Sequence, residues 1–239
     1  MRKFFLFGDS HAGPLMRAAE SMDLGFAGGS IMAGKHMNDP FFAVKDGVFE
    51  MLTELGRERL AIRLERAGLD ENLLALDMPF LCTLGFNTHS FYSSFREERD
   101  FAVRGSQGKW FVTAACFEAV VTGARQGTFA FYAALCDAGK DVYAVRSPQR
   151  FDAKQAPVWK AYEDIVAGKL AAMGVKIVDV RAETTDENGA LRPEFASADP
   201  KDRVHANNDY ATIVLKRFEE MLSPSPMRAN TPAQSPALS

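Results

Sequence analysis

Three polar residues of this sequence have the types that serine-based nucleophilic chemistry requires: Ser10, Asp202 and His205. A serine hydroxyl is a weak nucleophile until a base accepts its proton, and that base is usually a histidine whose ring a carboxylate orients. Asp202 and His205 are three positions apart, so the carboxylate can reach the ring nitrogen that faces away from the serine. A glycine N–H and the side-chain amide of Asn87 can donate to a developing oxyanion. These residue types favour acyl transfer.

Each of these residues also has an ordinary structural interpretation. Ser10 directly precedes a predicted helix and is a residue type that caps helices. Asp202 belongs to the charged run ASADPKDR, and Asn87 lies in a glycine-containing turn, where asparagine is common. The chemical interpretation therefore depends on the fold bringing these residues to one place.

Apolar segments of strand length alternate with amphipathic segments of helical period along the chain. The predicted strands are residues 4–7, 24–27, 79–84, 141–145 and 175–180. The predicted helices are residues 11–22, 57–67, 128–138, 158–173 and 210–221, and residues 30–47 and 105–109 are predicted as a long loop and a turn. This alternation predicts an α/β protein with three layers, α/β/α, around a parallel five-stranded sheet.

The reactive residues follow predicted strands or precede the last predicted helix. Sites in open parallel sheets form at the carboxyl ends of the strands. The four stretches at such positions are Gly8-Asp9-Ser10-His11, GGSIMAG (residues 28–34), Gly85-Phe86-Asn87 and Asp202-Arg203-Val204-His205. We expect them to meet at one edge of the sheet.

These four blocks, in this order, resemble those of the SGNH (GDSL-type) hydrolases. The resemblance spans residues 8–205 and implies the flavodoxin-like three-layer fold of that family. It also implies that Ser10 is the nucleophile, His205 the general base and Asp202 the group that orients His205. The oxyanion hole would consist of the Ser10 N–H, the Asn87 amide and a glycine of the second block, for which the family's usual spacing favours Gly34.

The sequence departs from the family pattern in two blocks. Thr88 follows Asn87 where the family often has aspartate, which leaves the oxyanion donor in place. In the second block Gly28 and Gly29 remain alternatives to Gly34, although both also suit a turn. The pattern GDSH, in which His11 follows the serine, resembles that of a subset of the family. Members of this subset act on acylated carbohydrates or transfer acyl groups to them.

The resemblance implies a serine esterase that hydrolyses a carboxylic ester, with an O-acetylated carbohydrate as one candidate substrate, through an acyl-serine and without a cofactor. An O-acyltransferase acting on carbohydrates with the same residues is the first alternative. A carbohydrate-binding or scaffold protein is another, although it would gain nothing from Ser10, Asp202 and His205 together. GDSHAG and FNTH also resemble blocks of metallophosphoesterases, but the GDxxD and GHxH segments of a two-metal site are missing from the sequence. We therefore predict no metal site.

Several further residues near the blocks are candidates for substrate binding: His11, His89, Arg146 and Arg150. An arginine fork suits carboxylates and phosphates, although arginines on a solvated loop are equally ordinary. His36 is predicted as a loop residue. The aromatic residues Phe41, Phe42, Phe86, Phe91, Tyr92 and Phe95 either wall a substrate pocket or pack in the core.

Composition narrows the classes of partner. The 239 residues carry a formal net charge of -3, so no basic surface points to nucleic acid or an anionic membrane. No apolar run approaches the length of a membrane span, and we expect a cytoplasmic protein. Three cysteines in apolar context, Cys82, Cys116 and Cys136, predict buried reduced thiols. We predict one domain over residues 1–222 and a disordered tail rich in proline, serine and alanine over residues 223–239, with the oligomeric state left open.

Overall fold

The sheet that carries the site has five strands, all parallel to their neighbours, in the order β2-β1-β5-β8-β9. The computed structural model describes residues 3–89, 91, 101–103, 110–151 and 156–223. The strands of the sheet are β1 (Phe4–Gly8), β2 (Phe26–Ser30), β5 (Phe80–Cys82), β8 (Val142–Val145) and β9 (Lys176–Val178). If these five strands are renumbered 1 to 5 along the chain, their order in the sheet is 2-1-3-4-5, which is the order of flavodoxin-like folds.

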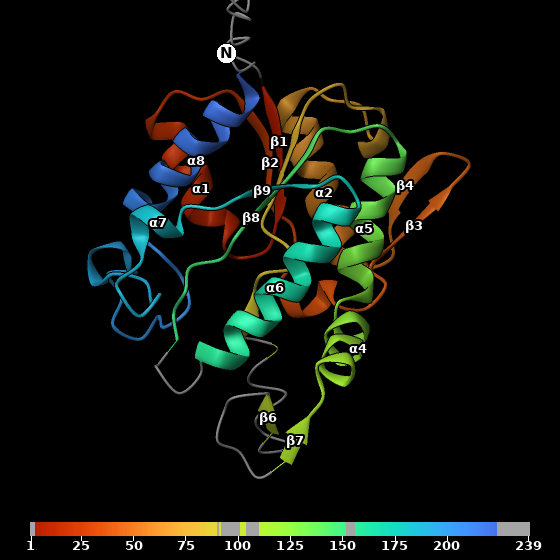
Figure 1. Ribbon diagram of the computed structural model, residues 1–239. Coiled ribbons are helices and arrows are strands. Elements are labelled where there is room, and N and C mark those ends of the chain that lie inside the picture. Colours follow the sequence, from red (N-terminus) through yellow and green to blue (C-terminus); the bar gives the residue numbers. More distant parts are fainter. Residues whose placement is uncertain (1–2, 90, 92–100, 104–109, 152–155, 224–239) are drawn as a thin grey trace, which may run out of the picture.

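Helices cover both faces of this sheet (Figure 1). One face carries α1 (Ala12–Ser21) and α8 (Asn208–Leu222), and the other carries α2 (Glu54–Ala67), α5 (Gln126–Asp137) and α6 (Ala156–Ala172). Successive residues of β1 explain why: Phe4 and Leu6 pack against α1 and α8, whereas Phe5 and Phe7 pack on the opposite side. A strand buried on both faces reads as a continuous apolar run. The predicted three-layer α/β/α fold class is confirmed.

The remaining elements lie around this frame. They are β3 (Phe42–Lys45), β4 (Val48–Met51), β6 (Phe101–Val103), β7 (Trp110–Val112), α4 (Ala114–Ala124), α7 (Arg181–Thr184) and the short 3-10 segments η1 (Gly34–Met37), η2 (Leu73–Ala75) and η3 (Pro193–Phe195). β6 and β7 form a small parallel sheet of their own.

The structure corrects the expectation for residues 30–47. Instead of one long loop, this region contains η1 and the first strand of an antiparallel hairpin, β3–β4. The hairpin turns at Asp46-Gly47, where both residues have positive φ, and Asp-Gly is a favoured pair in such turns. The pair Asp46-Gly47 could thus have indicated a hairpin, but the polar residues 34–40 before it led to the prediction of a loop.

The second strand also differs from its prediction. β2 begins and ends later than residues 24–27, so Gly28 and Gly29 lie inside the strand and not in a turn after it. A Cβ on Gly28 would lie 2.1 Å from the Leu6 carbonyl oxygen of β1, so β1 and β2 can approach as they do only with glycine there.

Two helix boundaries follow capping residues more than apolar spacing. The Thr53 side chain accepts a hydrogen bond from the Gly56 N–H, so α2 begins before the predicted residue 57. The Asn207 side chain accepts from the Tyr210 N–H and starts α8 directly after the loop that carries His205. The capped start of α8 therefore fixes where that loop ends.

Some predictions concern cysteines and regions of uncertain placement. Cys82, Cys116 and Cys136 are free thiols; Cys82 is buried as predicted, whereas Cys116 is exposed and that part of the prediction is wrong. Residues 104–109 and 224–239 lie outside the described residues, so the turn and the tail stay predictions, as does the single domain. Across the described part of the chain, no helix combines the length and apolar character needed to cross a membrane.

Candidate active site

Ser10, His205 and Asp202 form a continuous hydrogen-bonded chain at the carboxyl end of the sheet. The His205 Nε2 atom lies 2.8 Å from Ser10 Oγ, and His205 Nδ1 lies 3.0 and 3.1 Å from the two carboxyl oxygens of Asp202. Ser10 follows β1 at the point where the order of the sheet reverses, which is the usual ligand crevice of such sheets. The arrangement can move a proton from the serine to the histidine.

The alternative interpretation of Ser10 as a helix cap is wrong. The first turn of α1 receives no side-chain capping hydrogen bond, and the residue at its N-cap is His11. The Ser10 side chain is exposed and bonds to His205 instead. The hydroxyl is thus available to solvent and to a ligand.

The backbone around His205 is held on both sides. The N–H groups of Val204 and His205 donate to one Asp202 carboxyl oxygen, each at 3.0 Å. The His205 carbonyl oxygen accepts from the Ser197 N–H at 3.1 Å and from Arg150 Nη1 at 2.7 Å. Arg150 therefore supports the loop of the histidine, and its role as a substrate ligand stays a prediction.

The electrostatics keep Asp202 ionised. Partial burial of its carboxyl group acts to raise the pKa, but the backbone N–H groups of His205 and Val204 and the neighbouring imidazole outweigh it. The net effect is a pKa well below the ordinary range of aspartate. The carboxylate is therefore available to stabilise a protonated His205 ring.

Asp9 organises the turn that presents Ser10. Its side chain is almost fully buried, with 1% of its surface exposed. One carboxyl oxygen accepts from the His11 N–H and from the Thr83 hydroxyl, both at 3.0 Å, and the other accepts from Asn87 Nδ2 at 3.3 Å. Asp9 thus links the Ser10 turn to the Asn87 turn. This role was not predicted, because the GDS pattern does not show which residues the aspartate contacts.

Gly34 is the glycine of the second block that lies at the site. A Cβ at this position would be 2.1 Å from Asn87 Nδ2 and 2.6 Å from Asp9 Oδ2. Gly28 and Gly29, by contrast, are packed inside β2 against the Phe5 ring and the Met16 side chain. The structure places Gly34 beside Asn87 and beside Asp9, the residue before Ser10.

His11 and His89 form an aromatic cluster with His205. The ring centroids of His11 lie 4.9 Å from those of His205 and 5.8 Å from those of His89. Burial lowers the pKa of His11, and burial together with the charge of the neighbouring His11 lowers the pKa of His89 to about 4. Both rings are therefore neutral near pH 7.

The neutral histidines make folding stability depend on pH. Between the ordinary histidine pKa of 6.5 and about 4, the unfolded chain binds protons at His89 and the folded chain does not. The free energy of unfolding should therefore fall as the pH drops through this window, by at most about 1.4 kcal/mol per pH unit for each histidine. Urea denaturation across the window should show a shallower pH slope for His89→Gln than for the wild type. A wild-type slope in His89→Gln would contradict this prediction.

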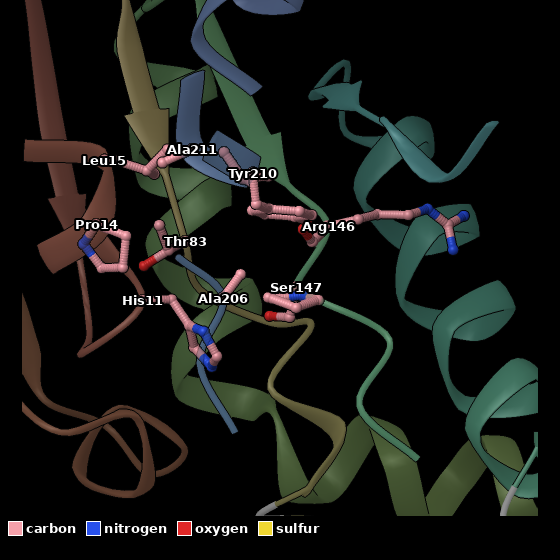
Figure 2. A pocket seen from close by; sticks show the side chains of 11 residues that line it. His11, Pro14, Leu15, Thr83, Arg146, Ser147, Ala206, Tyr210 and Ala211 are labelled. Atoms are coloured by element: carbon pink, nitrogen blue, oxygen red, sulfur yellow. Dashed lines mark hydrogen bonds between the residues drawn. The ribbon is translucent and has the colours of Figure 1, made fainter. Parts of the chain in front are cut away.

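A small cavity lies beside His11 (Figure 2). Its volume is about 20 Å³, and its walls are largely apolar, with Tyr210 and Val145 among them. Figure 2 shows His11 and Ser147 on the same side of this cavity. A space of this size holds roughly one water molecule, so it is too small for the acyl chain of a substrate.

Arg146 points away from the site (Figure 2). Its guanidinium is buried and lies 2.9 Å from Glu163 Oε2 on α6 and 3.2 Å from Asp179 Oδ2. Removing one member of a buried ion pair strands the other charge. The interpretation of Arg146 as an anion-binding group is therefore corrected to a structural ion pair that fixes the loop after β8.

The described aromatic candidates belong mainly to the core. Phe41 and Phe42 contact Phe131 of α5, with ring centroids 5.7 and 5.9 Å apart, and Phe86 and Phe91 are buried. Tyr92 and Phe95 lie outside the described residues. Core packing thus explains the described part of this cluster.

The metallophosphoesterase alternative requires a cluster of metal-ligating side chains. Within the described ranges, no group of three or more histidine, cysteine, aspartate or glutamate side chains has an arrangement that could hold a metal ion. The neighbouring His11, His89 and His205 rings are instead related by ring contacts.

Comparison with known proteins gives similarity of fold. Neither the protein-family models nor the curated proteins contain a match to this chain. Among solved structures it is similar to Axe2, an acetylxylan esterase from Geobacillus stearothermophilus, with 14% identity, a TM-score of 0.47, and coverage of 93% of this chain and 94% of the other. It is also similar to a protein described as a platelet activating factor from Streptococcus pneumonia (14% identity, TM-score 0.45, 92% and 83% coverage).

A third similar structure is described as a GDSL-like lipase from Parabacteroides merdae (9% identity, TM-score 0.42, 92% and 94% coverage). At such identities the likeness concerns the fold and not the chemistry. What this chain's own structure shows is an α/β/α fold with a parallel sheet of flavodoxin-like order, at whose carboxyl edge the four sequence blocks meet.

Proposed function

We propose that this protein is a serine esterase that hydrolyses a carboxylic ester through an acyl-serine intermediate. The observation that carries the proposal is the hydrogen-bonded chain from Ser10 Oγ to His205 Nε2 and from His205 Nδ1 to Asp202. The substrate class that we propose is a small ester, with an O-acetylated carbohydrate as the first candidate. No cofactor takes part in this reaction.

The reaction runs in two halves. Ser10 Oγ attacks the ester carbonyl carbon while His205 Nε2 takes the hydroxyl proton, and the carbonyl oxygen becomes an oxyanion. When the tetrahedral intermediate collapses, the bond to the alcohol oxygen breaks and the alcohol leaves with the proton from His205. A water molecule then attacks the carbonyl carbon of the acyl-serine and gives one proton to His205. The bond to Ser10 Oγ breaks, Oγ takes that proton from His205, and the carboxylic acid leaves.

The oxyanion requires donors close to Ser10. We propose the backbone N–H groups of Ser10 and Gly34 and the Nδ2 group of Asn87. Gly34 is close enough to Asn87 Nδ2 that any side chain there would collide with it. His11 and the half-buried His89 beside it remain candidates for contact with the alcohol part of the substrate.

Labelling with a fluorophosphonate tests the proposal directly. Ser10 Oγ would displace fluoride from phosphorus, and the tryptic peptide of residues 4–17 contains Ser10 as its only serine. We expect the mass increase on this peptide in the wild type and in Ser21→Ala, whose serine lies at the other end of α1. Acetate release from aryl acetates and acetylated sugars, with and without an added sugar acceptor, separates hydrolysis from acyl transfer.

Two results would contradict the proposal. The first is a protein that neither reacts with fluorophosphonates nor cleaves any ester of the panel. The second is phosphate release from a phosphoester that appears only with added Mn²⁺ or Zn²⁺, which would favour the metallophosphoesterase alternative.

Gly34→Ala should disturb the oxyanion donors without backbone strain. The new Cβ would lie 2.1 Å from Asn87 Nδ2, so the amide must move away. Removal of one oxyanion donor typically lowers kcat by about 10²–10³-fold, and we expect a loss of that order for this variant. Gly168→Ala in α6 is the matched control, because its Cβ meets no atom within 4 Å. That variant should keep kcat and gain up to about 1 kcal/mol of stability.

A further inference from the structure

Arg125 is a buried arginine between α4 and α5 whose fork connects three segments of the chain. Only 1% of its surface is exposed. Nη2 donates to the Asn87 carbonyl oxygen at 3.2 Å, Nη1 donates to Asn38 Oδ1, and Nε donates to the Tyr162 hydroxyl. The Tyr162 hydroxyl in turn donates to the Gly85 carbonyl oxygen at 2.5 Å. Arg125 therefore contacts the Asn87 turn directly and also through Tyr162.

The first turn of α5 holds the loop that follows Gly34. The Gly127 N–H donates to the Asn38 carbonyl oxygen at 2.8 Å, and the Thr128 hydroxyl donates to the Met37 carbonyl oxygen at 3.0 Å. A Cβ on Gly127 would lie 2.0 Å from the Asp39 carbonyl oxygen, so the loop and the helix are in close contact. Since η1 begins at Gly34, this contact determines where that residue lies.

Two of the three proposed oxyanion donors, Asn87 and Gly34, thus come from separate segments that both contact Arg125 or the first turn of α5. Asn87 follows β5, and Gly34 follows β2, with β1 between these strands in the sheet. Arg125 donates to a residue in each segment, to Asn87 and to Asn38. The Asn87 side chain itself faces Asp9 and Gly34.

We propose that Arg125 is a positioning residue that sets the Asn87 amide against Gly34, so that both groups donate to the same oxyanion. This inference rests on the proposed esterase function. Arg125 does not touch the substrate; it acts through Asn87 and the loop of Gly34. An oxyanion hole accelerates the reaction only if its donors are fixed before the charge develops.

Arg125→Lys is the variant that isolates this role. A lysine keeps the positive charge, but its single ammonium cannot reach the Asn87 carbonyl, Asn38 and Tyr162 in the geometry of the guanidinium fork. We expect kcat to fall about 10–100-fold, with KM changed less than about 3-fold, because the lost interaction acts on the transition state. In an Asn87→Ala background the same substitution should change kcat by less than about 5-fold.

Tyr132→Phe, in the helix α5 that follows Arg125, serves as the matched control. It removes one buried hydrogen bond, from the Tyr132 hydroxyl to the Leu84 carbonyl oxygen at 2.9 Å, and should lower stability with kcat unchanged. Equal losses of kcat for Arg125→Lys with and without Asn87 would overturn the inference. So would a kcat that stays at the wild-type value in Arg125→Lys.

A spectroscopic readout makes the test independent of turnover. The side-chain amide signals of Asn87 are assigned by their loss in Asn87→Ala, and the Gly34 amide by its loss in Gly34→Ala. In ¹⁵N–¹H spectra, Arg125→Lys should shift both signals and Tyr132→Phe should leave them in place. Shifted signals in a protein that hydrolyses no ester would support the positioning role while rejecting the esterase; unshifted signals would reject the positioning role.

Discussion

Ser10→Ala is expected to lower kcat for ester hydrolysis by at least ~10³-fold while the protein stays folded. Removal of the hydroxyl removes the atom that would form the acyl intermediate, and the residual rate would come from binding and the oxyanion donors alone. The structural cost should be small, no more than about 1 kcal/mol, because Ser10 is exposed, caps no helix and makes one side-chain hydrogen bond, to His205.

The measurement is steady-state hydrolysis of an aryl acetate, together with urea denaturation of the same preparations. Ser21→Ala is the control, since its hydroxyl bonds only to the Ala18 carbonyl oxygen of its own helix. A Ser10→Ala protein that hydrolyses esters at the wild-type rate would show that the serine is not the nucleophile.

Asp202→Asn is expected to lower kcat by about 10⁴-fold, the size of effect seen for this change in serine proteases. The asparagine can still accept the N–H groups of Val204 and His205 through its carbonyl oxygen. Its NH₂ group then occupies the position of the second carboxyl oxygen, 3.1 Å from His205 Nδ1. That contact favours the tautomer with hydrogen on Nε2, which cannot accept the proton of Ser10, and the negative charge that stabilises the imidazolium is lost.

Asp199→Asn provides a control in the same loop. The Asp199 carboxyl group accepts the Lys201 N–H at 2.9 Å in a similar turn but does not contact His205 among the described interactions. Its kcat should equal that of the wild type. Equal losses in the two variants would mean that the loop, and not the orientation of His205, accounts for the effect of Asp202.

The fold class could be predicted because the apolar segments of the sheet strands are buried on both faces. Phe4–Phe7 is apolar without alternation, and this run with its neighbours indicates a parallel sheet covered by helices. The hairpin β3–β4 was missed because each of its strands has only four residues, and the run FFAV (residues 41–44) was interpreted as part of an aromatic cluster.

The site was predictable only where its members stand in recognisable blocks. Ser10, Asn87, Asp202 and His205 could be named because each lies in a short pattern at a strand end or before the last helix. Asp9 was inside a block, but its bond to Asn87 joins residues 78 positions apart and leaves no local trace. Arg125 lies between two helices with no neighbouring motif, so nothing in the sequence connects it to Asn87.

Arg146 and Arg150 illustrate a further limit. Both follow a strand at the reactive edge, and residue type alone suggested that they bind an anion. Whether an arginine faces a ligand or a carboxylate of its own protein depends on which helix packs over it. Here Arg146 forms an ion pair with Glu163 of α6. Arg150 Nη1 donates a hydrogen bond to the backbone carbonyl oxygen of His205.

The hydrogen bond between Ser10 and His205 joins residues that are 195 positions apart. The two helices that follow them, α1 and α8, pack on the same face of the sheet, and Arg17 Nε donates to Asn208 Oδ1 at 3.1 Å. During synthesis Ser10 is therefore made long before His205, and under the proposed mechanism its hydroxyl has no base until the loop before α8 is in place. Under the proposed mechanism, ester hydrolysis would then require the docking of α8 on α1, the same contact that buries Val214, Leu215 and Phe218 in the core of that face.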